Sequence, residues 1–196
     1  GYTLTLMGET MCAGAIDGGP KITTDSLLGL AEAHYGVAIT NATTAHDTVS
    51  LEMALLGRAR ERLDRGQPVN AAADAALIPA GFLKVATYDG GSTRRENRLY
   101  TVMFRDLFYS VDVPFQHFMT QGSPDPRVVA DSTRILGQDQ VTHIWAAEKY
   151  PSIGTPIPIA HWSEAQLIQA EAANDANNPA VAINFINAIR ASEALP

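Results

Sequence analysis

Aromatic side chains are the residues of this sequence whose chemistry best suits the binding of a ligand. Trp145, Tyr150 and Trp162 lie in or beside segments rich in Pro and Gly. Flat aromatic faces at a surface suit the C–H faces of sugar rings, and polar groups at the edges supply hydrogen bonds. We therefore predict these three residues as ligand-binding residues. The alternative, that each ring fills the core beneath a loop, remains open.

The common catalytic motifs are missing from the sequence. G-x-S-x-G, G-x-G-x-x-G and H-E-x-x-H do not occur, and "YDGGSTRR" lacks the Lys-Ser/Thr of a phosphate-binding loop. The five histidines never fall four residues apart, as two metal ligands on one helix would. We interpret Glu164 as support for a helix start, and Asp125-Pro126-Arg127 as a Pro-fixed turn. We thus expect no catalytic residue, no metal and no cofactor; a hydrolase would need a buried pair of carboxyl groups facing a cleft.

The composition indicates a globular protein that does not bind nucleic acid. The chain has 196 residues, enough for one large or two small domains, of which 46% are hydrophobic and 18% charged. A net charge of −7 argues against nucleic acid as a partner. Basic residues are scattered apart from one group: Arg58, Arg60, Arg62 and Arg65. Because Glu61 and Asp64 alternate with this group, we interpret it as a solvated helix face.

Cys12 is the single cysteine, which excludes an internal disulfide and a multi-cysteine metal site. We expect it to be a buried thiol. The surrounding "LTLMGETMCAG" is loosely similar to a lipid-attachment motif, but Glu9 interrupts its apolar run. Because the chain opens on Gly1 without a signal segment, we expect that the gene begins further upstream.

Helical periodicity dominates residues 24–81. Three helices are predicted: one of about sixteen residues capped by Thr24 or Asp25, one from about Thr48 to Arg65 that stops at Gly66, and one from Pro68 to about Leu77. Gly57 and the alanines of "NAAADAALIPAG" permit a close helix crossing, as in a tetratricopeptide repeat. Met53 and Arg60 stand where a consensus repeat has bulky aromatics, so the block is repeat-like only.

The rest of the chain divides into two parts. Residues 82–160 are predicted to form an irregular, loop-rich region that faces a ligand or a partner. Residues 161–196 are predicted to form a helix pair, with Ser163 as the cap of the first helix and Pro179 at the start of the second. The apolar side of the second helix is assigned to Val181, Ile183, Ile186 and Ile189.

The C-terminal segment "PIPIAHWSEAQLIQAEAAND…AVAINFINAIRASEALP" resembles the signature helices of the SusD/RagB family. The matching residues are Glu164, Leu167, Ile168, Ala170, Glu171 and Ala172 in the first helix, and Ile186, Asn187, Ile189 and Arg190 in the second. Upstream, "AIDGGP", "GRARERLDRGQPVNAAADAALIPAGF", "SPDPRV" and "EKYPSIGTPIPIA" are similar to segments of the same family, in the same order. The resemblance covers nearly the whole chain.

The resemblance implies one mostly α domain over residues 1–196, with tetratricopeptide-like helix pairs in an α-α superhelix and an irregular loop-rich insertion. It implies a non-catalytic bacterial cell-surface lipoprotein that binds a glycan or other nutrient and delivers it to a SusC-like TonB-dependent outer-membrane transporter. A lipid anchor outside this chain would attach it to the membrane. Because typical members are longer, we expect a fragment. The alternative is a helical-repeat module for protein–protein interaction or self-assembly, without glycan binding.

Overall fold

The computed structural model describes residues 1–193, which divide into two compact units. We call Gly1–Lys84 together with residues 159–193 the helical unit, and Val85–Pro158 the irregular unit. About half of the chain is helical, and the described residues form eight helices and four two-stranded sheets. The prediction of a mostly α protein is confirmed. In residues 1–193 no helix is both long and apolar enough to cross a membrane.

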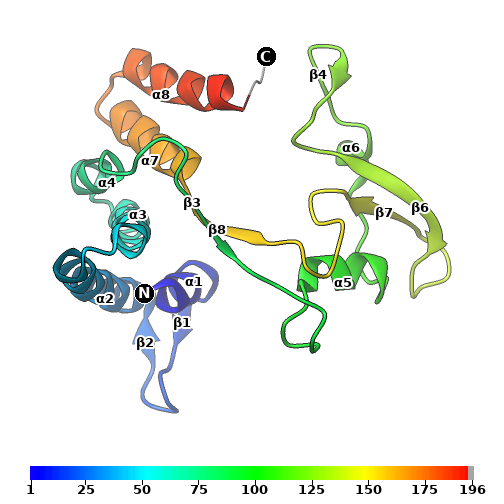
Figure 1. The fold of residues 1–196 in the computed structure, drawn as a ribbon, viewed down its shortest axis with the longest axis horizontal. Helices are drawn as coiled ribbons and strands as arrows, with labels where there is room; N and C mark the ends of the chain where they lie inside the picture. The colour runs from blue at the N-terminus through cyan, green and yellow to red at the C-terminus, as the bar shows by residue number, and fades with distance from the viewer. Residues whose placement is uncertain (194–196) are drawn as a thin grey trace. The chain divides into compact units, whose positions relative to one another are not determined.

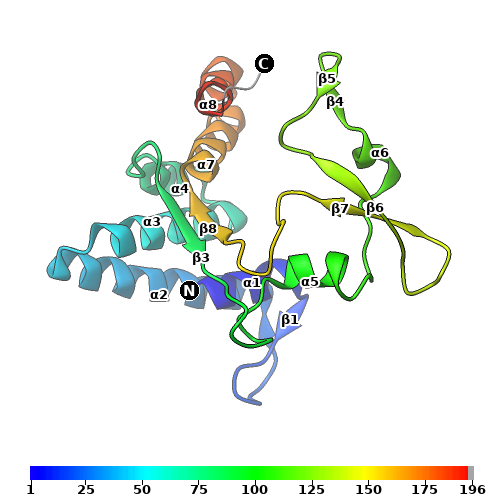
Figure 2. The same ribbon diagram turned by 45° about the vertical axis from the view of Figure 1, so that its right-hand side comes forward.

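The helical unit is built from helices that pack in succession (Figures 1 and 2). Its elements are α1 (Tyr2–Thr10), β1 (Ala13–Gly14), β2 (Ile22–Thr23), α2 (Thr24–Ala45), α3 (Thr48–Asp64), α4 (Pro68–Ala75), α7 (Trp162–Asp175) and α8 (Pro179–Ser192). Contacts run from α1 to α2, on to α3 and α4, and then to α7 and α8. The far end of the sequence thus continues the row begun at its start, because α7 packs on α4.

α2 begins one residue earlier and extends further than the sequence indicated. Its N-cap is Thr23, whose hydroxyl accepts a hydrogen bond from the Ser26 amide at 3.3 Å. Its 22 residues include the polar run "NATTA", where we expected a break. The hydroxyls of Thr43 and Thr44 donate to carbonyls one turn back, so these residues fit inside a helix. His46, in the left-handed conformation with φ 56°, ends it.

The predicted ends of the next helices agree closely with the structure. Asp47 caps α3, and Gly66, which follows the C-cap in the left-handed conformation with φ 70°, ends the helix. Pro68 opens α4 as expected. The close crossing predicted at Gly57 is confirmed, since a side-chain carbon at this position would lie 2.4 Å from the ring of Tyr35.

Small residues dominate the core of the helical unit, which joins α3, α4 and α7. The buried residues of this core are Leu55, Leu56, Ala59, Ala71, Ala75, Ile78, Phe82, Ala160, Ala165 and Ile168. Their alanines allow the helices to approach closely. Replacing a large member such as Leu56, which is fully buried, by alanine costs about 2–5 kcal/mol in comparable cores.

Two local predictions for the helical unit are wrong. Cys12 is exposed rather than buried, because it lies in the bend between α1 and β1. α7 is capped by His161, whose Nδ1 accepts from the Ser163 amide at 3.2 Å; Ser163 instead donates to Glu193. The chain passes from β8 (Ile157–His161) directly into α7, so the last extended residue becomes the cap.

The apolar side predicted for α8 is largely uncovered in the structure. Among its described residues only Ala182 is buried, whereas Ile183 and Ile186 are 54% and 42% exposed. α7 is the helix that packs on α8, and it covers one narrow side.

The irregular unit has short elements and a small core. Its elements are α5 (Arg98–Phe104), α6 (Val113–Gln116), β4 (Met119–Thr120), β5 (Ser123–Pro124), β6 (Ala130–Leu136) and β7 (His143–Ala147). β6 and β7 form an antiparallel hairpin in which Ser132 faces Trp145, with a register shift before Leu136. The boundary between the units falls within β3 (Leu83–Ala86) and β8, which pair in a two-stranded sheet. The sequence predicted the irregular region at residues 82–160, within three residues of the bounds of the irregular unit.

Asn97 is the main polar anchor of the irregular unit. It is fully buried and caps α5, with its Oδ1 accepting from the amides of Leu99 and Tyr100. Its Nδ2 donates to the Thr155 carbonyl at 2.7 Å, and its amide donates to the Ile153 carbonyl at 2.8 Å. One side chain therefore fixes the start of α5 to a segment more than fifty residues away.

Candidate functional site

The β6–β7 hairpin positions Trp145 through the alternation of its strands. Ile144 and Ala146 point into the core, at 2% and 0% exposure, so Trp145 occupies the opposite face of β7. The ring of His117 meets the Trp145 ring edge-on, with centroids 4.8 Å apart. The backbone of Trp145 is held by Ser110 and Val111, at 2.9 and 2.8 Å. Trp145 is thus a half-buried ring on a fixed backbone, as a platform for a ligand would require.

Tyr150 and Trp162 have different surroundings. Tyr150 is half-buried at the turn after β7, and the ammonium of Lys149 lies 5.9 Å from the centre of its ring. Trp162 belongs to the helical unit, packs against the main core and donates from its amide to the Phe82 carbonyl at 2.9 Å. Two of the three predicted residues therefore lie in the irregular unit, and the third contributes to a core. Their role in binding stays a prediction.

Asp125 organises a tight turn after β5. Its carboxylate is almost completely buried and accepts from the amide and Nε of Arg127, both at 2.9 Å, and from Arg127 Nη2 at 2.6 Å. The hydroxyl of Thr120 donates to the same carboxylate. The bonds from Arg127, followed by that from Thr120, hold the pKa of Asp125 well below its usual range. The Val128 amide closes the turn on the Asp125 carbonyl at 3.2 Å, which confirms the predicted Pro-fixed turn.

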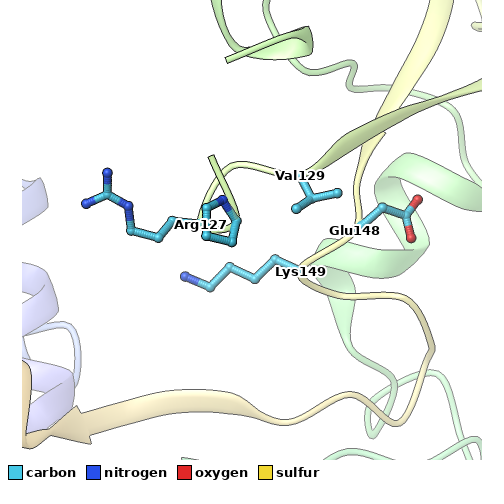
Figure 3. A pocket seen from close by; sticks show the side chains of 5 residues that line it. Arg127, Val129, Glu148 and Lys149 are labelled. Atoms are coloured by element: carbon cyan, nitrogen blue, oxygen red, sulfur yellow. The ribbon is translucent and has the colours of Figure 1, made fainter. Parts of the chain in front are cut away.

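A pocket of about 370 Å³ opens beside this turn (Figure 3). It is lined by Pro126, Arg127, Val129, Glu148 and Lys149. The Glu148 amide donates to the Val129 carbonyl at 2.9 Å, which extends the hairpin pairing and holds the two walls together. Its volume falls within the range of small-molecule sites. No pattern in the sequence indicated this pocket, because its walls are about twenty residues apart and meet only through the register of the hairpin.

Figure 3 shows how the charged side chains of this pocket lie. The side chains of Arg127 and Lys149 extend in the same direction, and the carboxylate of Glu148 points the other way. The pocket therefore presents two cations on one side and an apolar surface from Pro126 and Val129. Such a surface suits a small ligand with an apolar face and a negative group.

The arginines of α3 do not form the solvated face that the sequence indicated. Arg58 and Arg62 both bind Asp74 of α4, at 2.8 Å, and Arg62 also binds Glu32 of α2. Arg60 Nε donates to Glu164 of α7 at 2.6 Å. Because α3 has neighbours on several sides, arginines all around it find acidic partners on other helices. The same bond corrects the interpretation of Glu164, which joins two helices as well as lying in a first turn.

Glu61 is the most unusual polar residue of the helical unit. It has no exposed surface, and its two carboxyl oxygens have no hydrogen-bond partner among the described residues. Burial raises the pKa of Glu61 to about 7, against a smaller lowering by the nearby Thr5. Burial and the charge of Glu9 raise the pKa of Asp64 to about 6. Although two perturbed carboxyl groups can mark a catalytic site, Glu61 has no surface through which a substrate could reach it.

No group of three or more His, Cys, Asp or Glu side chains in residues 1–193 is arranged to hold a metal ion. Comparisons of the chain with protein families, curated proteins and solved structures find no match.

Proposed function

We propose that this protein is a non-catalytic cell-surface nutrient-binding protein of the SusD/RagB type, which captures a glycan and delivers it to a SusC-like TonB-dependent outer-membrane transporter. The proposal includes a lipid anchor outside this chain and a tetratricopeptide-like superhelix in the helical unit. It rests on the ordered sequence resemblance, and two structural features support it.

The observation that carries the proposal is the combination of Trp145 and a pocket within one irregular unit. Trp145 offers a half-buried ring on a fixed backbone, and the pocket lined by Pro126 and Lys149 lies in the same unit. The same unit also exposes several large apolar side chains: Phe108, Tyr109, Val113, Phe115 and Met119. Sugars combine apolar faces with polar edges, and this unit offers surfaces for both.

The helical unit has the features of a scaffold that supports a ligand-binding irregular unit. The helical unit uses its arginines and acids for bonds between helices, as in the pairs Arg58–Asp74 and Arg60–Glu164. The close contact of Gly57 with Tyr35 supports a repeat-like stacking of α2 and α3. A rigid scaffold that positions ligand-binding loops is a common arrangement in binding proteins.

A glycan array followed by calorimetry on the purified chain tests the proposal. We expect binding of at least one glycan, reduced by Trp145→Ala and unchanged in a folded Trp162→Phe variant, which keeps a ring at the core of the helical unit. Absence of binding to every glycan would refute the function. For the transporter, a gene for a TonB-dependent transporter adjacent to that of this protein is the expected context.

A second candidate function is protein–protein interaction or self-assembly through the helical unit. The observation in its favour is an apolar groove of about 520 Å³ between α7 and α8, lined by Leu167, Ile183 and Ile186 among others. These three side chains are 42–54% exposed. Concentration-dependent association that is lost in Ile183→Ser, without any glycan binding, would favour this function over the first.

A further inference from the structure

The pocket beside the Asp125 turn has features that narrow the ligand of the proposed function. Two of its lining residues, Pro126 and Val129, have side chains made of carbon only. Its volume of about 370 Å³ is small for a drug-sized molecule and suits one or two sugar units. Its walls are joined by the bond from the Glu148 amide to the Val129 carbonyl. The pocket is thus a defined shape with room for a ring.

Lys149 supplies the charge of this pocket. It is exposed, and among the described residues it makes no ion pair. Glu148 also lines this pocket, but in Figure 3 its carboxylate points in the opposite direction from the ammonium of Lys149. In a chain with a net charge of −7, a lysine that makes no ion pair among the described residues, and whose ammonium has only the ring of Tyr150 5.9 Å away as an aromatic neighbour, is a specific feature beside the apolar side chains of Pro126 and Val129.

Arg127 adds a second positive group whose position is fixed. Asp125 holds the guanidinium through two bonds, at 2.9 and 2.6 Å, and is itself buried. Figure 3 shows the Arg127 side chain extending in the same direction as that of Lys149. The charge of Asp125 offsets part of that of Arg127, so Lys149 dominates the attraction for a ligand.

We propose that this pocket binds an acidic sugar, with Lys149 holding its anionic group and Pro126 and Val129 contacting the C–H face of its ring. Carboxylate and sulfate groups share the chemistry required, because both accept charge-assisted hydrogen bonds from an ammonium group. The inference rests on the proposed function and makes it narrower: the glycan that this protein captures carries negative charges.

The test compares acidic and neutral sugars on the full chain by calorimetry. The probes are an oligosaccharide of galacturonic acid, a galactose oligosaccharide of the same length, a sulfated galactose oligosaccharide, and sodium acetate or sodium sulfate alone. We expect at least one acidic oligosaccharide to bind more tightly than the neutral one, and the difference to shrink in 1 M NaCl, where charges are screened within about 3 Å.

Variants of Lys149 assign the effect to this pocket. Lys149→Met keeps the length of the side chain without its charge, and we expect affinity for the acidic oligosaccharide to fall about fivefold, as for an exposed charge pair worth about 1 kcal/mol. Lys149→Arg restores binding, and Lys21→Met, at an exposed lysine of the helical unit, leaves it unchanged. Arg127 is left intact, because its removal would leave Asp125 buried without its partner.

The outcomes separate this inference from the function on which it rests. Binding of neutral and acidic oligosaccharides with equal affinity, or unchanged binding in Lys149→Met, would overturn the inference and leave the function standing. Equal affinity for the simple salts would mean an adventitious ion only and would also overturn it. Failure to bind any glycan on the array would overturn both.

Discussion

The two units of this protein differ in how they use polar and apolar residues. The helical unit carries thirteen acidic and seven basic residues, and the irregular unit eight and seven. Among the described residues, eighteen buried hydrophobic side chains lie in the helical unit and three in the irregular one: Met103, Ile144 and Ala146. The helical unit is held by a core and by ion pairs between helices. The ion pairs of the irregular unit join residues close in sequence, such as Arg105 and Glu96, and its more distant segments are joined by buried polar residues such as Asn97.

This difference determines which residues are available for binding. A side chain such as Asp74, which is engaged in ion pairs that stabilise the fold, is not available to contact a ligand. In the irregular unit the buried residues Asn97 and Asp125 make the stabilising hydrogen bonds. Side chains such as Trp145 and Lys149 therefore remain available at the surface.

The largest effect is expected at Asp74, which ties two arginines of α3 to α4. Asp74 is 5% exposed, and Asp74→Ala would leave Arg58 and Arg62 without their common partner. We expect the free energy of unfolding to fall by about 3 kcal/mol. Chemical denaturation measures it, with Asp175→Ala on the exposed end of α7 as a control. A change as small as that of the control would contradict the structural role of these ion pairs.

A comparable effect is expected from pH in the helical unit. Burial raises the pKa of Glu61 from 4.5 to about 7. Below pH 4.5 the carboxyl is protonated in both folded and unfolded chains, so it adds no pH dependence. Between pH 4.5 and 7 the unfolded chain loses this proton first, so stability falls as pH rises; above pH 7 the loss is complete, at about 3 kcal/mol.

Denaturation midpoints between pH 4.5 and 8 check this expectation. Glu61→Gln should flatten the profile. Asp64→Asn should change the profile only slightly, between pH 3.8 and about 6: the pKa of Asp64 is raised to about 6, but its side chain is exposed and solvent screens most of the effect. Stability that rises with pH over this window in the wild type, and not in Glu61→Gln, would contradict the buried, unpaired state of Glu61.

A smaller effect is expected at Asn97, the polar anchor of the irregular unit. Asn97→Ala removes the cap of α5 and the bond to the Thr155 carbonyl, so we expect a loss of about 2 kcal/mol. Hydrogen exchange would locate the loss in α5 and in residues 153–155. Asn70→Ala, at an exposed position of α4, is the control. Faster exchange throughout the helical unit would show that the stability of this unit depends on the irregular unit, which would contradict the division into two independently stable units.

The two tryptophans give the smallest and most direct contrast of stability. Trp162 packs on the main core of the helical unit, while Trp145 packs on His117 at the outer face of a hairpin. We expect Trp162→Ala to cost about 2 kcal/mol of unfolding free energy and Trp145→Ala about 1 kcal/mol. Thermal denaturation of both variants tests this order, and the reverse order would place Trp145 in a core.

Sequence reasoning was successful where structure depends on neighbours in the chain. Gly66, Pro68 and Pro179 fix helix ends through their own backbone geometry, and all three lie where the pattern placed them. Gly57 also marked a close crossing, because only a glycine fits against the Tyr35 ring.

The sequence patterns gave wrong predictions, or none, where the interaction partners of a residue lie far away in the sequence. The arginines of α3 were assigned to solvent because their acids, Glu32, Asp74 and Glu164, lie on three other helices. α1 was not predicted, since its nine residues carry no capping signal and no acidic first turn. The pocket of Arg127 and Lys149 depends on the register of a hairpin, which alternation of residue types does not determine.

Hydrogen exchange of the full chain with and without a bound glycan tests the central claim most directly, since the claim is that the irregular unit binds the ligand and the helical unit supports it. The account predicts that the glycan slows exchange within residues 85–158, around Trp145 and the 125–129 and 148–150 segments that line the pocket, and leaves α2, α3 and α8 unchanged. Protection along α7 and α8 with none in residues 85–158 would contradict it.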